Sequence, residues 1–271
     1  MYTLEQQLAG HSLADALAQI ESDIKARPAD ADLRAAFVQL LCLAGNWTRA
    51  ATQLKSWLAL KPAAQPTVTL LEQAITGELQ REAVMTGAAA PDMPVAQWPW
   101  LQEMASALTA QAADAAALRN TALDSAEANP GTLTGQNQDP CEFDWLMDGD
   151  ARLGPVCELI VNGKYCWLPF SAIEEMRFQA PEGAIDLVWR HTLVRLVDGS
   201  EQVCQIPARY PLEPGAADRF LLGRATEWQA LDEEGIHYQG QGQKVWLNAD
   251  GEFPLLALET LTFHGGDDSD E

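Results

Sequence analysis

The sequence of 271 residues predicts an α+β protein, in which N-terminal helical repeats pack with a β-rich α+β module. Three observations predict this fold class. Apolar positions recur at a fixed interval before residue 130, and turn signals separate apolar runs after residue 140. A polar segment rich in turn formers lies between the two patterns. We therefore expect a tetratricopeptide-like helical domain over 1–130, a β-rich α+β domain over 140–266, and a disordered acidic tail over 267–271.

The helical part contains an internal repeat. Leu13, Ala16, Ile20, Ile24 and Pro28 recur 34 positions later as Trp47, Ala50, Leu54, Leu58 and Pro62. This interval is the tetratricopeptide period, and positions three or four apart line one face of a helix. Proline cannot continue a helix and ends each unit.

The first helix of the second repeat unit is predicted over 32–44, capped by Asp30 or Asp32 and ended by Gly45 and Asn46. A weaker helical echo runs over 100–130, after a predicted loop over 86–99. This number of repeats is too small for a free-standing solenoid. We therefore expect the helical part to pack on another part of the chain.

The C-terminal part carries turn signals typical of antiparallel strands. Asn162-Gly163 separates apolar runs over 156–161 and 165–168 and predicts a hairpin. Asp198-Gly199 and Asp250-Gly251 predict a second hairpin and a further turn. We expect a short helix over 171–177, whereas 255–261 fits a helix or a strand.

The composition limits the classes of partner that the protein can bind and indicates its cellular compartment. The formal net charge of −22 disfavours binding to nucleic acid or to an anionic membrane. No apolar run is long enough to span a bilayer, and the N-terminus lacks a signal-peptide pattern. The five cysteines form no C-x-x-C pair, so we expect reduced thiols in the cytoplasm. Cys157 and Cys166 could face each other across the first hairpin, without a disulfide.

No motif of a known catalytic site is present, and no two histidines have metal-ligand spacing. Asp148 and Asp150 are the best candidates for a divalent-ion site. However, Glu158 falls one position short of the last ligand of a calcium loop, and Arg152 puts a positive charge at the site. An Asp–Arg pair that caps a turn is the structural interpretation, and we predict no catalytic, cofactor-binding or metal-binding residues.

Arginines next to aromatic residues are the candidate partner-binding or signature positions. Such pairs suit an interaction surface, but core packing with local ion pairing is the favoured interpretation of each. The candidates are Arg152, Trp189, Arg209, Tyr210, Arg224 and Trp228.

Short stretches spread from about Leu4 to Phe263 together resemble the ImpE/SciE/TagJ family of bacterial type VI secretion accessory proteins. They are 27–34, 39–47, 150–155, 162–170, 186–189, 206–211 and 222–228. Each stretch is unspecific alone, and their order and number carry the resemblance. The segment 135–140 and the acidic tail depart from the pattern.

The resemblance implies a non-enzymatic cytoplasmic accessory protein without a cofactor. Its implied partner is the N-terminal helix of the small sheath subunit, and it is expected to modulate engagement of the sheath by the AAA+ ATPase. Two alternatives remain open: a metal-assisted hydrolase that uses Asp148 and Asp150, and a general peptide-binding scaffold.

Overall fold

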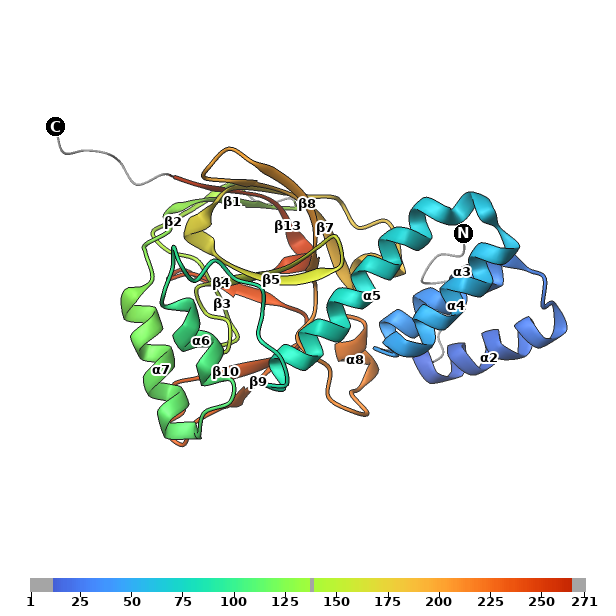
Figure 1. Cartoon of the computed structure of the whole chain (residues 1–271), viewed down its shortest axis with the longest axis horizontal. Helices are drawn as coiled ribbons and strands as arrows, with labels where there is room; N and C mark the ends of the chain where they lie inside the picture. The colour runs from blue at the N-terminus through green and yellow to red at the C-terminus, as the bar shows by residue number, and fades with distance from the viewer. Residues whose placement is uncertain (1–11, 137–138, 265–271) are drawn as a thin grey trace.

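The computed structural model describes residues 12–136 and 139–264. The helices over residues 13–60 lie at one end of the molecule, and a strongly curved antiparallel sheet forms the other end (Figure 1). The predicted α+β class is confirmed. The predicted acidic tail lies outside the described residues.

Three helices pack as sequential neighbours at the start of the described residues: α2 (Leu13–Ala26), α3 (Ala31–Leu43) and α4 (Trp47–Leu60). Asp30 caps α3 by accepting hydrogen bonds from the backbone N–H groups of residues 32 and 33. Gly45, at φ +68°, ends α3 in the left-handed conformation. The repeat positions of α2 are all buried, as are Trp47, Ala50 and Leu54 of α4. The tetratricopeptide character of these helices stays a prediction.

Helix α5 (Gln65–Met85), which follows the short 3-10 turn η1 (Pro62–Ala64), joins the two parts of the molecule. It runs from the helical end to the sheet and packs on strands β4 (Val156–Val161) and β5 (Lys164–Pro169) (Figure 1). One hydrophobic core contains side chains of α2 to α5 together with Ile160, Trp167 and Trp189. The helices therefore have no separate core of their own.

Gly77 is where α5 approaches the sheet most closely. A Cβ atom there would lie 2.4 Å from Cγ2 of Ile160 in β4. We expect Gly77→Ala to destabilise the protein by up to about 2 kcal/mol, because an overpacking cost of about 1–3 kcal/mol outweighs the gain of about 1 kcal/mol in helix propensity. Urea unfolding checks this. Thr76→Ala, at an exposed position of the same helix, should leave stability unchanged or slightly raised. A Gly77→Ala protein more stable than wild type would contradict the close packing.

Two further helices, α6 (Leu101–Ala107) and α7 (Ala112–Ser125), pack against each other beside the sheet. The predicted loop before them is largely irregular, and Asp92 forms an isolated parallel bridge with Cys166. Because β5 is an edge strand, this bridge covers part of its unpaired backbone.

The main sheet has eight strands in the order β2-β1-β13-β6-β7-β8-β4-β5. A three-stranded sheet has the order β12-β11-β3, and β9 pairs with β10. The remaining elements are β1 (Gly131–Gly135), β2 (Cys141–Phe143), β3 (Met147–Asp148), η2 (Phe170–Ala172), β6 (Ile173–Phe178), η3 (Ala184–Leu187), β7 (Trp189–Leu196), β8 (Glu201–Pro207), α8 (Asp218–Leu221), β9 (Thr226–Ala230), β10 (Tyr238–Gly242), β11 (Val245–Leu247), β12 (Glu252–Pro254), η4 (Leu255–Ala257) and β13 (Leu258–Phe263).

All three turn predictions are confirmed. Asn162 and Gly163 both have positive φ, +50° and +83°, and join β4 to β5. A two-residue hairpin turn with two positive φ angles favours this Asn-Gly pair. Asp198-Gly199 lies in the turn between β7 and β8, and Asp250-Gly251 lies between β11 and β12.

Two local predictions need correction. The expected helix over 171–177 is wrong: the turn η2 leads into strand β6, which pairs with β13 and β7 and buries Ile173, Met176 and Phe178. Tertiary packing overrides helix propensity here. Cys157 and Cys166 also do not face each other, because Leu168 and Leu159 are their respective partners in the ladder. The open choice over 255–261 resolves to the turn η4 followed by strand β13.

Candidate functional site

Residues 150–155, one of the stretches that carry the family resemblance, form a tight turn after β3. The buried carboxylate of Asp150 stabilises this turn. Asp150 is fully buried. Its oxygens accept from Nε and Nη2 of Arg152, at 2.9 and 2.6 Å, and from the backbone N–H groups of Arg152 and Gly240. This is the Asp–Arg pair that the sequence predicts, and both carboxylate oxygens are bound by protein donors.

Asp148 belongs to a second buried ion pair. Its Oδ2 lies 2.6 Å from Nζ of Lys244, and its Oδ1 accepts from the hydroxyl of Tyr210 at 3.0 Å. Burial raises the pKa of Asp148 to about 6, and the ammonium of Lys244 opposes that shift. Asp148 and Asp150 are therefore enclosed by protein partners and do not converge on an open cleft.

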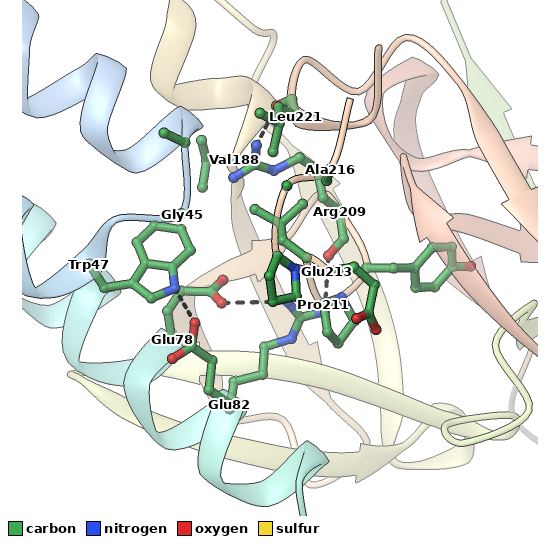
Figure 2. Close-up of a pocket in the computed structure, with 16 residues that line it drawn as sticks. Gly45, Trp47, Glu78, Glu82, Val188, Arg209, Pro211, Glu213, Ala216 and Leu221 are labelled. Carbon is green, nitrogen blue, oxygen red and sulfur yellow. Dashed lines mark hydrogen bonds and ion pairs between the residues drawn. The ribbon is translucent and has the colours of Figure 1, made fainter. Parts of the chain in front are cut away.

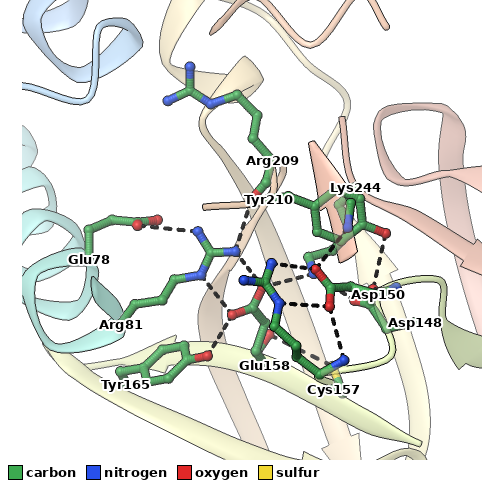
Figure 3. Close-up of polar contacts among 12 residues, drawn as sticks. Glu78, Arg81, Asp148, Asp150, Cys157, Glu158, Tyr165, Arg209, Tyr210 and Lys244 are labelled. Carbon is green, nitrogen blue, oxygen red and sulfur yellow. Dashed lines mark hydrogen bonds and ion pairs between the residues drawn. The ribbon is translucent and has the colours of Figure 1, made fainter. Parts of the chain in front are cut away.

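Glu158 links the sheet to helix α5. Burial alone would raise its pKa, but the cations of Arg81 and Lys244 outweigh burial and lower the pKa to about 2. Arg81 binds both carboxylate oxygens at 2.7 and 2.6 Å, Lys244 lies 2.8 Å away, and Tyr165 donates its hydroxyl at 2.6 Å (Figure 3). We call Arg81, Asp148, Glu158 and Lys244 the charged cluster. It contains two cations and two carboxylates, all buried.

A pair of tryptophans lies beside this cluster. The indole N–H of Trp189 donates to Oε1 of Glu78 at 2.9 Å, and that of Trp47 donates to Oε1 of Glu82 at 2.7 Å. Their rings pack at 5.6 Å between centroids. Since burial is the largest influence on Glu78, its pKa is raised, with Arg81 opposing. The tryptophans fix the side chains of α5 against α4 and the sheet.

Arg209 joins the sheet to the ends of two helices. Its guanidinium donates to the backbone oxygens of Cys42 and Leu43 in the last turn of α3, at 3.1 and 2.7 Å, and also to that of Leu221 in α8. Carbonyl groups at a helix C-terminus lack partners within the helix, and a cation there is favourable. Burial lowers the pKa of Arg209 to about 10.

A cavity of about 370 Å³ opens between the two parts of the molecule. The start of α4 and helix α5 form one side, and the loop 211–216 forms the other (Figure 2). Glu78, Arg81 and Arg209 lie on its inner wall, while Glu82 and Glu213 are exposed. Trp47, Val188 and Pro211 supply apolar lining.

The predicted candidate residues fall into buried and accessible groups. Trp189, Arg209 and Tyr210 are buried, and Arg152 is half-buried. Trp228 is half-buried and packs on Tyr210 at 5.6 Å between ring centroids, whereas Arg224 is exposed. Of the six, the structure brings Arg209 and Tyr210 to the cavity.

The sequence alone did not place Arg81, Glu78 or Lys244 in the site, and it marked Glu158 only as a near match to a calcium ligand. Glu158 is the one charge in the apolar run 156–161, and Lys244 directly precedes the apolar strand β11. A charge inside such a run signals a buried partner. Arg81 and Glu78 gave no such signal, because helix α5 also carries the exposed charges Glu72 and Glu82.

Histidine, cysteine and carboxylate side chains form no group of three or more that could hold a metal ion within residues 12–136 and 139–264. In the same residues, no helix is both long and apolar enough to cross a membrane.

The comparisons with known proteins agree with this architecture. A family model described as ImpE protein matches residues 141–262. The type VI secretion system accessory component TagJ of Pseudomonas aeruginosa is 37% identical over 269 residues, which cover 97% of this chain and 92% of that protein. The crystal structure of protein VPA1032 from Vibrio parahaemolyticus has a TM-score of 0.82 at 25% identity and covers 93% of this chain and 94% of its own.

The fold and the site together define this chain as a two-part α+β protein, in which a buried ion pair and the guanidinium of Arg209 fasten helices to a curved sheet. The similarity to TagJ covers nearly the whole chain and therefore identifies one family within this class. This chain belongs to the ImpE/TagJ family and is a type VI secretion accessory component.

Proposed function

We infer that this protein is a non-enzymatic, cytoplasmic adaptor of the type VI secretion machine. It binds the N-terminal helix of the small sheath subunit and thereby modulates how the AAA+ ATPase engages the sheath. The observation that carries the proposal is the relationship to TagJ across 97% of the chain.

Two features of the molecule support an adaptor role. The charges at the centre of the site neutralise one another: Glu158 binds Arg81 and Lys244, and Asp150 binds Arg152. Such pairs hold a scaffold in one geometry. The cavity beside them is open to solvent and has apolar and acidic lining, which suits a side chain of a bound helix.

A titration tests the proposal. A synthetic peptide with the sequence of the sheath subunit's N-terminal helix, from the same bacterium, is titrated into the full-length protein by calorimetry. We expect a one-to-one complex with a Kd of about 1–50 μM, the range of a single helix in a groove. The same peptide with a central proline should bind at least tenfold more weakly, because proline breaks the helix. Absence of binding by the unmodified peptide contradicts the proposal. Recovery of an unrelated partner from the native host would then favour a general scaffold.

A further inference from the structure

The cavity continues into a second hollow along α5. Both are lined by Ala44, Gly45, Trp47 and Glu82, and the second reaches Leu79. Leu79 is 41% exposed and lines this second hollow on the side of α5. Leu79 and Glu82 are three positions apart and therefore share one face of α5. We call the two hollows together the α5 groove.

The cations that line the groove are committed to partners inside the protein. Arg81 donates to Glu158, to Glu78 and to the backbone oxygen of Arg209. The guanidinium of Arg209 is bound to the carbonyl groups of α3 and α8. Neither arginine is therefore positioned to bind an anionic ligand at the mouth of the groove.

The carboxylates of Glu82 and Glu213, at the mouth of the groove, are not paired with cations of the protein in the described ranges. Glu82 accepts a hydrogen bond from the neutral indole of Trp47, and within the described ranges neither Glu82 nor Glu213 has a salt-bridge partner. They extend from opposite sides of the cavity, one from α5 and the other from the loop 211–216 (Figure 2). The net charge of −22 adds a long-range attraction for cations. The groove is thus complementary to a positively charged side chain.

The apolar lining adds a second requirement. The stem of a lysine or arginine can pack on Trp47, Val188 and Pro211 while its charged end reaches the carboxylates. Leu79, which lines the second hollow beside the cavity, offers an apolar contact. A segment that satisfies both places a basic and an apolar residue about one turn apart on one face of a helix.

We propose that the α5 groove docks an amphipathic helix by taking one lysine or arginine side chain into the cavity, where Glu82 and Glu213 bind its charged end and Leu79 contacts a neighbouring apolar residue. This proposal rests on the proposed function and names the surface and the chemistry by which the sheath helix is held.

The test compares two double variants with equal changes in net charge. Glu82→Gln/Glu213→Gln removes the carboxylates of the groove, whereas Glu72→Gln/Glu252→Gln removes two exposed carboxylates elsewhere on α5 and on β12. The sheath-helix peptide is titrated into each full-length protein at low and moderate salt. We expect the groove variant to bind about tenfold more weakly at low salt, and the control to change less than twofold. Glutamine at position 82 keeps an oxygen for the indole of Trp47, so folding should be preserved, which thermal unfolding checks.

Each outcome of this comparison decides a different point. Equal binding by wild type and the groove variant overturns the groove proposal and leaves the proposed function intact. Equal weakening of both double variants also overturns it, because only the overall charge would then matter. If the wild type does not bind the peptide, the proposed function fails, and the groove proposal fails with it. Replacement of each basic residue of the peptide by alanine should identify one position that abolishes the difference between wild type and the groove variant.

Discussion

Glu158→Gln is expected to lower the free energy of unfolding by about 3–5 kcal/mol, because it leaves two buried cations without their shared counter-ion. Arg81 and Lys244 both bind this carboxylate, and Glu158 is 1% exposed. Lys244 keeps Asp148 as a partner, so the loss is concentrated on Arg81, for which Glu78 is the remaining carboxylate at 3.4 Å. Urea unfolding at neutral pH measures the effect.

An exposed ion pair provides the matched control. Glu227 lies 2.5 Å from Arg219, and both side chains are more than half exposed. Glu227→Gln should change stability by less than about 0.5 kcal/mol, because solvent screens such a pair. A similar, small effect of both substitutions would show that the charged cluster is dispensable for stability.

The effect of Glu158 should also depend on pH. Its pKa is lowered from the ordinary value of 4.5 to about 2 in the folded protein. A carboxyl group with a depressed pKa stabilises the fold above its unfolded pKa, and that stabilisation is lost as the pH falls through the folded pKa. The stability difference between wild type and Glu158→Gln should therefore be full above about pH 4.5 and shrink steadily toward pH 2. A difference that stays constant over this range would contradict the assignment.

Arg209→Met should cost about 3 kcal/mol, because it removes the donors of three backbone carbonyl groups while it keeps an apolar stem. The loss should be local as well as global. Hydrogen exchange should accelerate at the C-terminal turn of α3 and at α8, which Arg209 fastens to the sheet, before it accelerates in β7 and β8.

Arg224→Met is the matched control, since Arg224 is also a signature arginine but is exposed. It should leave both the unfolding free energy and the exchange of α3 unchanged. If Arg209→Met behaved like Arg224→Met, the carbonyl contacts would contribute nothing measurable to the junction.

Local sequence signals predicted the parts of this fold that local chemistry determines. Asn162-Gly163 satisfies a turn with two positive φ angles, so its hairpin could be predicted without tertiary information. The pairing of Asp150 with Arg152 likewise involves residues two positions apart. In contrast, residues 173–178 became a strand because β13 and β7 flank them, and no local property of those residues reports this.

The site required information that one sequence does not contain. Arg81 and Glu158 lie 77 positions apart, and Arg209 is 166 positions from the carbonyl group of Leu43. The sequence did mark Arg209, Tyr210 and Trp189 as unusual. It could not separate an exposed binding surface from a buried junction, because arginine with aromatic residues serves both.

The ion pair between Arg81 and Glu158 has a consequence for how this family can diverge. The guanidinium belongs to the helical half and the carboxylate to the sheet half, and each is costly without the other. A substitution of either residue alone should therefore cost more than a matched change of both. A chimera that joins halves from different relatives should fold well only if it keeps matched charges at this contact.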